Sequence, residues 1–156
     1  MRQTYSPPNG HDFAGLMARP RGPATLAMTP TRPDITTETD VKLLVDRFYD
    51  KVNADALLAP IFNEFAQVDW PRHLPAMYDF WSSLLLGTSR YHGRPFPKHL
   101  PLPIDATHFE QWLVLFNATV EELFAGPRAE EAKVRALNIA NMFEFRLRRR
   151  DPLSLL

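Results

Sequence analysis

The chain has 156 residues, a length that is expected to form a single domain. Hydrophobic residues make up 45% of the sequence and aromatic residues 12%, which is enough for a substantial buried core. Eighteen basic and eighteen acidic residues balance, so nothing in the charge favours binding to nucleic acid or to an anionic membrane surface. The absence of cysteine excludes disulfides and thiolate metal sites. No apolar run approaches the roughly 20 residues of a membrane span, and we expect a cytoplasmic protein.

Residues 1–33 are predicted to form a disordered extension before a single folded domain at residues 34–150. Prolines interrupt any helix in this segment, and its apolar residues show no helical period. The apolar stretches are short and broken by arginine and proline, which is unlike a secretory signal. Residues 151–156 are expected to form a C-terminal tail.

A first amphipathic helix is predicted from Thr36 until Asn53 or Asp55. Thr37, followed three residues later by Asp40, is typical of a helix N-terminal cap. A compact apolar connector at residues 57–62 follows. The apolar residues of the helix recur with the i, i+3, i+4 spacing of one buried face: Val41, Leu44, Val45, Phe48, Tyr49 and Val52.

A second long helix is predicted to begin after Asp69, a good N-cap residue, with Pro71 in its first turn and Gly87 at its end. Residues 87–106 are rich in glycine and proline and leave room for only one helical turn, around His99. The apolar face of the second helix comprises Trp70, Leu74, Met77, Tyr78, Trp81, Leu84 and Leu85.

The last third of the chain predicts two more helices. Thr107 and Glu110 have the spacing of a capping box and mark the start of the first. Residues 126–127, Gly-Pro, separate it from a final helix at residues 130–149. We expect Phe109, Trp112, Leu113, Phe116, Val120 and Leu123 to face inward from the first of these helices, and Val134, Leu137, Ala140, Phe143 and Leu147 from the second. No segment alternates with period two, so the fold is predicted to be all-α.

Four side chains carry the chemical interpretation. His99 lies on a proline-bounded turn between aromatic helices, where a neutral imidazole could bind the iron of a flat cofactor. Tyr49 and Trp112 lie on inward helix faces, and each needs a hydrogen-bond partner there. His73 shares a helix face with Met77. Each placement alone is more typical of core packing or polar surface, but together they favour a ligand pocket.

The sequence resembles the truncated haemoglobins, and within them the third of three groups. The match covers about residues 35–149 and excludes the N-terminal extension. Glycine pairs typical of the first two groups are missing, as expected for the third. The matching residues are 48–52, 60–63, Trp70 with His73, 80–81, 91–95, 98–102, 108–109, 112–113 and Phe116.

This resemblance implies a globin-like two-over-two helical sandwich around haem b (iron protoporphyrin IX). By position, His99 corresponds to the proximal iron ligand. Tyr49 and Trp112 correspond to distal residues that stabilise a bound ligand, and His73 to the distal histidine that gates the pocket. Further haem contacts are implied at Phe62, Met77 and Phe109, with Trp81 on the haem-facing side of its helix and Tyr91 able to reach a propionate.

The implied function is binding of dioxygen, nitric oxide or a related small gas at ferrous iron. Redox chemistry, such as dioxygenation of nitric oxide or a peroxidase-like reaction, or gas sensing is favoured over oxygen transport, and an unidentified reductase would return ferric haem to the ferrous state. Two alternatives remain. One is an interaction module whose aromatics are only core. The other is a non-haem metal site built from His73, His92, His99 and His108, with Asp105 and Glu110 as the nearest carboxylates.

Overall fold

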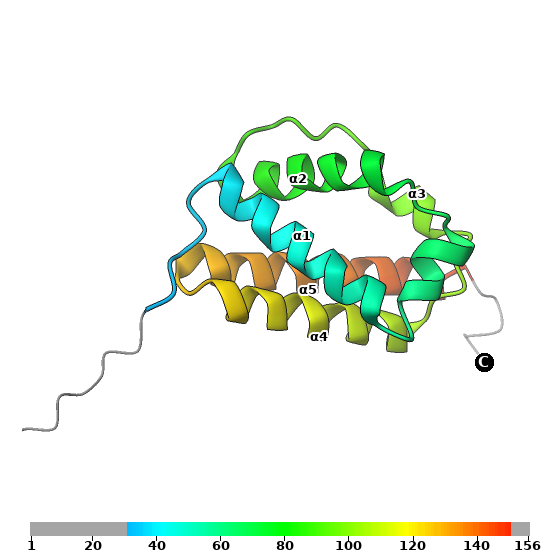
Figure 1. Ribbon diagram of the computed structural model, residues 1–156. Coiled ribbons are helices and arrows are strands. Elements are labelled where there is room, and N and C mark those ends of the chain that lie inside the picture. Colours follow the sequence, from blue (N-terminus) through cyan, green and yellow to red (C-terminus); the bar gives the residue numbers. More distant parts are fainter. Residues whose placement is uncertain (1–30, 151–156) are drawn as a thin grey trace, which may run out of the picture.

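The structure is a computed structural model that describes residues 31–150 (Figure 1). The predicted C-terminal tail and all but the last three residues of the predicted extension lie outside the described residues. All regular elements within residues 31–150 are helical, so the predicted all-α class is confirmed. The elements are α1 (Glu38–Ala54), η1 (Ile61–Phe65), α2 (Trp70–Leu86), α3 (Pro95–His99), α4 (Ala106–Leu123) and α5 (Pro127–Arg148).

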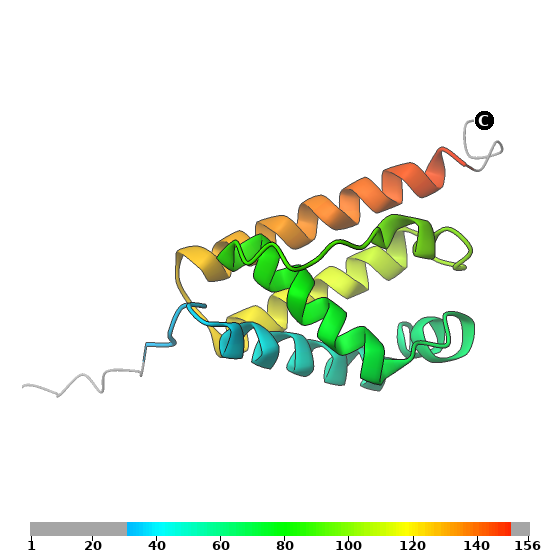
Figure 2. The same cartoon turned by 90° about the horizontal axis from the view of Figure 1, so that it is seen from above.

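The long helices form two antiparallel pairs, α1 with α2 and α4 with α5 (Figure 1). Helix α1 also packs on α4, which joins the two pairs. The segment after α2 runs back along that helix and leads into the short helix α3 (Figure 2). The predicted two-over-two arrangement is therefore present, and it brings the element that carries His99 beside the C-terminal half of α5.

Local capping interactions fix where the helices begin. The predicted cap of α1 is confirmed, because the Asp40 N–H donates to Thr37 Oγ1 at 3.2 Å and the Thr37 N–H donates to Asp40 Oδ2 at 2.8 Å. The predicted capping box at the start of α4 is wrong. Asp105 is the N-cap and accepts from the Thr107 N–H at 2.9 Å, while the Asp105 N–H donates to His108 Nδ1 at 3.2 Å. A carboxylate is a better acceptor than a threonine hydroxyl at a helix N-terminus, which moves the cap two residues earlier.

The predicted inward face of α5 is wrong at two positions. Val134 is 56% exposed and Leu137 is 47% exposed. The helix begins at Pro127 rather than at residue 130, and its buried face consists mainly of small side chains, which allow a close approach to α4. The buried residues of this face are Ala129, Ala132, Ala136, Ala140 and Phe143.

The residues just before α1 are bound to the start of α5. The carboxylate of Asp34 accepts from the N–H groups of Arg128 at 3.0 Å and Ala129 at 2.9 Å, so it caps α5 from a distance along the chain. Gly126, with φ 139°, has no room for a side chain, because a Cβ there would lie 2.6 Å from Cγ of Asp34. The globin-like domain therefore includes the residues immediately before α1.

A stack of three aromatic rings forms the centre of the core. Phe116 is fully buried on α4. Its ring stacks on Trp81 of α2 with centroids 4.7 Å apart, and on Trp112 of α4 with centroids 5.5 Å apart. Phe48 of α1 contacts the rings of Phe116 and Trp112 edge-on. This stack packs α1, α2 and α4 together, and two of its rings, Trp81 and Trp112, belong to predicted site residues.

Candidate functional site

His99 is the last residue of α3 and is half-buried. Its Nδ1 lies 2.6 Å from the carbonyl oxygen of Pro95, so the ring proton sits on Nδ1 and is donated to that carbonyl. Burial lowers the pKa of His99 and outweighs the opposing effect of the Pro95 carbonyl. The imidazole is therefore neutral and fixed in one tautomer, with the lone pair of Nε2 directed away from its own helix, as a metal-binding histidine requires.

An apolar cluster surrounds this side of the site. The ring of Phe143 on α5 lies 4.8 Å from the ring of His99 and 5.3 Å from that of Phe96. Phe109 on α4 belongs to the same cluster, with Ala140 of α5. The resemblance implied that Phe109 contacts the haem. In the structure Phe109 belongs to the apolar cluster whose Phe143 ring contacts His99.

Tyr49 and His73 meet on the other side of the site. The Tyr49 hydroxyl lies 3.2 Å from His73 Nε2 and joins α1 to α2. Burial raises the pKa of Tyr49, which is 7% exposed, so the hydroxyl keeps its proton. The pKa of His73 is lowered mainly by burial and also by the nearby charge of Lys98, so its ring is neutral. In the tautomer with the proton on Nδ1, Nε2 of His73 accepts from the Tyr49 hydroxyl.

The other predicted histidine, His99, belongs to a different helix from His73. Its electrostatic effect contributes to the lowered pKa of His73. Lys98 lies beside them at the exposed end of α3. The structure therefore brings Tyr49 and His73, which are widely separated in the sequence, into direct contact.

Aromatic rings hold Tyr49 in one orientation. Its ring contacts Phe48 at 4.9 Å, Trp70 at 5.3 Å and Phe62 at 5.8 Å between centroids. Trp70 is itself fixed, because its indole N–H donates to the side-chain oxygen of Asn63 at 2.9 Å. Phe62 and Asn63 belong to η1, a π-helical turn, and such turns are frequent at functional sites.

Trp112 is half-buried and lies flat against Phe116. Its indole N–H has no hydrogen-bond partner among residues 31–150, so it is a free donor at the inner edge of α4. Met77 is half-buried on α2 and packs against the main core cluster. Trp81 is 3% exposed and belongs to the aromatic stack.

Tyr91 packs against two residues of α2. Its ring meets Phe80 edge-on at 5.1 Å, and its N–H donates to Ser83 Oγ at 3.2 Å. The hydroxyl passes over Gly93, where a Cβ would lie 2.5 Å from it. A larger residue at position 93 would therefore displace the end of the Tyr91 side chain.

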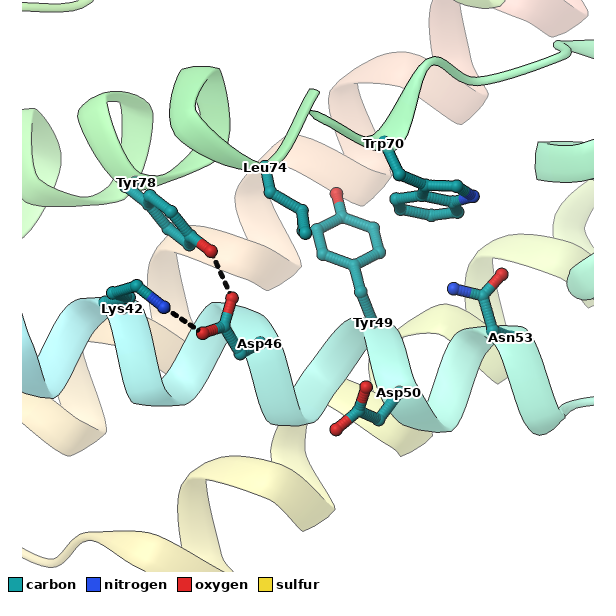
Figure 3. A pocket seen from close by; sticks show the side chains of 8 residues that line it. All are labelled: Lys42, Asp46, Tyr49, Asp50, Asn53, Trp70, Leu74 and Tyr78. Atoms are coloured by element: carbon teal, nitrogen blue, oxygen red, sulfur yellow. Dashed lines mark hydrogen bonds and ion pairs between the residues drawn. The ribbon is translucent and has the colours of Figure 1, made fainter. Parts of the chain in front are cut away.

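An open groove between α1 and α2 was not foreseen from the sequence (Figure 3). Its volume is about 560 Å³, and Tyr49 lies in its wall, whereas His99 does not. The groove therefore borders Tyr49 and does not contain the proposed iron-binding side chain of His99. An inward Tyr78 without an obvious partner was the signal that could have revealed it. The lining residues are Lys42, Asp46, Tyr49, Asp50, Asn53, Trp70, Leu74 and Tyr78.

The alternative metal site of four histidines gains no support. Within the part of the chain that the structure describes, no three histidine, aspartate or glutamate side chains converge on a common point. His108 is occupied by the helix cap at Asp105, and His92 is exposed in the loop before α3. No helix in residues 31–150 has the length and apolar character to cross a membrane.

Comparison with known proteins agrees with this geometry. Residues 34–145 match the family described as bacterial-like globin. The group 3 truncated haemoglobin of Campylobacter jejuni is 33% identical over 111 residues, which cover 69% of this chain and 87% of that protein. The group 1 truncated haemoglobin of Nostoc commune is 27% identical over 116 residues, covering 74% of this chain and 94% of that protein.

The fold comparison leads to the same family. The crystal structure of the group III truncated haemoglobin from Campylobacter jejuni superposes with a TM-score of 0.66 at 32% identity, covering 75% of this chain and 95% of that one. The predicted resemblance to truncated haemoglobins of the third group is confirmed. The chain belongs to the bacterial-like globin family, and this membership implies a haem cofactor and small gaseous ligands.

Proposed function

We propose that the chain would hold one haem b through His99 and would bind dioxygen, nitric oxide or a related small gas at its iron. The observation that carries the proposal is the neutral imidazole of His99, with Nδ1 locked to the Pro95 carbonyl and Nε2 left to bind iron. A haem supplies ferrous iron, which binds diatomic gases and exchanges electrons. The role of the chain is to hold that group and to control what approaches it.

The residues around His99 suit a flat apolar cofactor. Phe109 and Met77 are proposed to contact its faces, and Phe62 to limit its position near η1. Trp81 is proposed to support it from within the aromatic stack, where the side chain is buried. Tyr91 is proposed to reach a propionate, which requires its ring to leave the contact with Phe80.

Tyr49 and Trp112 are proposed as donors to the gaseous ligand. The Tyr49 hydroxyl stays protonated because it is buried, and the Trp112 N–H has no partner among the described residues. His73 competes for the Tyr49 hydroxyl when no ligand is present, and it also gates access to the pocket. Two donors hold a ligand strongly, since each hydrogen bond to a charged group contributes roughly 1.5–3 kcal/mol.

Slow release of the ligand favours redox chemistry or sensing over oxygen transport. Dioxygenation of nitric oxide and a peroxidase-like reaction both fit a site with two donors and a neutral histidine at its mouth. Dioxygenation of nitric oxide needs an electron-donating reductase to return the haem to the ferrous state, whereas a peroxidase-like reaction needs a reducing substrate. A cytoplasmic location remains a prediction. The competing proposal, a non-haem helical protein, is supported by no specific contact in residues 31–150.

The proposal is tested by purifying the parent protein, His99→Ala and His92→Ala and recording visible spectra. His92 is exposed in the neighbouring loop and serves as the control. We expect haem in the parent and in His92→Ala, and its loss from His99→Ala, with recovery when imidazole is added. Full haem content and an unchanged ferrous spectrum in His99→Ala would refute the assignment.

A further inference from the structure

Two side-chain hydrogen bonds connect α1 to α2 within residues 31–150. The first is the contact between Tyr49 and His73. In the second, the Tyr78 hydroxyl donates to Oδ1 of Asp46. Lys42 completes the second contact, because its Nζ lies 2.5 Å from Oδ2 of Asp46 and 5.1 Å from the centre of the Tyr78 ring. We call Lys42, Asp46 and Tyr78 the clasp (Figure 3).

We propose that the clasp sets the spacing of α1 and α2 and thereby positions the Tyr49 hydroxyl against His73. Asp46 and Tyr78 are positioning residues, and the inference rests on the proposed function, in which Tyr49 and His73 control the ligand. No residue of the clasp is proposed to touch the ligand itself.

The spacing along the helices supports this coupling. Asp46 precedes Tyr49 by three residues on α1, and Tyr78 follows His73 by five residues on α2. At a rise of 1.5 Å per residue, the two contacts lie about 4.5 to 7.5 Å apart along antiparallel helices. A helix is stiff over one to two turns, so a change of spacing at the clasp reaches the Tyr49–His73 pair.

The Tyr49–His73 contact is sensitive to such a change. Its length of 3.2 Å already lies at the long end for a hydrogen bond, and partners separated by about 3.6 Å no longer form one. A movement of a few tenths of an ångström would therefore release the Tyr49 hydroxyl from His73.

The three residues of the clasp line one end of the groove between α1 and α2. In the groove, from Asp46 to Trp70, side chains do not fill the space between the two helices. The polar contacts of the clasp therefore replace packing at one end of this opening (Figure 3). Loss of the clasp would also widen the groove beside Tyr49, which lies in its wall and is only 7% exposed.

The test compares Tyr78→Phe and Asp46→Asn in the full-length protein, loaded with haem and carbon monoxide. The stretching frequency of carbon monoxide reports hydrogen bonding to the ligand, and stopped-flow mixing gives dioxygen release. We expect both variants to shift the frequency in the direction opposite to that of Tyr49→Phe, because a hydroxyl released from His73 is free to donate to the ligand. We also expect release to slow by about threefold, which on a logarithmic scale is half the size of the tenfold effect of Tyr49→Phe.

A matched control is the ion pair between Lys51 and Glu122, at 2.6 Å, which ties α1 to α4 instead of α2. Glu122→Gln is expected to leave the frequency and the release rate unchanged. If Tyr78→Phe and Asp46→Asn lower the urea midpoint but behave like Glu122→Gln in both ligand measurements, the clasp is only a stabilising contact and the inference is wrong.

A second measurement separates this inference from the proposed function. Failure of the parent protein to bind haem would refute the proposed function alone. The ¹⁵N chemical shifts of the His73 imidazole in the haem-free chain then decide the inference. A change of these shifts in Tyr78→Phe, and none in Glu122→Gln, supports positioning through the clasp; shifts identical to those of the parent in Tyr78→Phe overturn it.

Discussion

Tyr49→Phe should speed dioxygen release, and the size of its effect on affinity should depend on His73. The hydroxyl is a buried donor whose partner in the structure is Nε2 of His73, at 3.2 Å. A ligand must therefore take over a hydrogen bond that already exists. The bond to the ligand is worth roughly 1.5–3 kcal/mol and the neutral bond to His73 about 1 kcal/mol, both from typical values.

These magnitudes give two expectations. Release reflects the bond to the ligand, so Tyr49→Phe should speed it by about tenfold or more. Affinity reflects the difference between the two bonds. In a His73→Leu background the competing bond is gone, so Tyr49→Phe should weaken binding by about fivefold more than it does in the parent.

Stopped-flow release and association rates for the parent, the two single variants and the double variant measure both effects. His73→Leu by itself should chiefly change association, because it opens the gate. Urea unfolding of each variant serves as the control, since Tyr49→Phe leaves Nε2 of His73 without its partner and is expected to cost about 1–3 kcal/mol of stability. Identical affinity losses in both backgrounds would refute the competition between His73 and the ligand.

Trp112→Phe removes an indole N–H that has no partner in residues 31–150, so dioxygen release measured by stopped flow should become about tenfold faster. If Trp112→Phe and Tyr49→Phe both release dioxygen at the parent rate, the two side chains only pack in the core. A chain that begins at residue 33 should bind haem with unchanged affinity in titrations, and loss of haem would show that earlier residues pack on the domain. Asp34→Ala should lower the free energy of unfolding by about 1–2 kcal/mol in urea, because α5 loses its cap. Burial lowers the pKa of His73, so the stability that its neutral form contributes is complete above about pH 6.5 and is lost as the pH falls below that value. The urea midpoint should drop accordingly, and less so in His73→Leu.

The helices and the place of His99 could be predicted because local rules determine them. Three local signals each act within a few residues: the spacing of apolar residues along a helix, the prolines and glycines that end helices, and the N-cap at Thr37. The same reasoning failed on α5, where it chose Val134 and Leu137 as buried. Hydrophobicity ranks these side chains above alanine, but close packing on α4 selects the smallest side chains, and that preference comes from the partner helix.

The polar contacts of the site could not be predicted for a related reason. The sequence places Tyr49 and His73 on inward faces of two helices, but the distance between them depends on how α1 and α2 cross. The contact of Tyr78 with Asp46 depends on the same crossing. Neither helix alone contains the information, so the pairing becomes visible only in three dimensions.

The helix that carries His99 is too short to be stable by itself. Its five residues fall well below the roughly 12–15 needed for a marginally stable isolated helix, so its order must come from tertiary contacts. Those contacts are the ring of Phe143 against His99 and Phe96, and the guanidinium of Arg146, 5.0 Å above the ring of Phe96. A haem bound at His99 would add one more contact to this helix. Folding of α3 and binding of the cofactor would therefore be thermodynamically linked, and substitutions at Phe143 should weaken haem binding although His99, the proposed iron ligand, is unchanged.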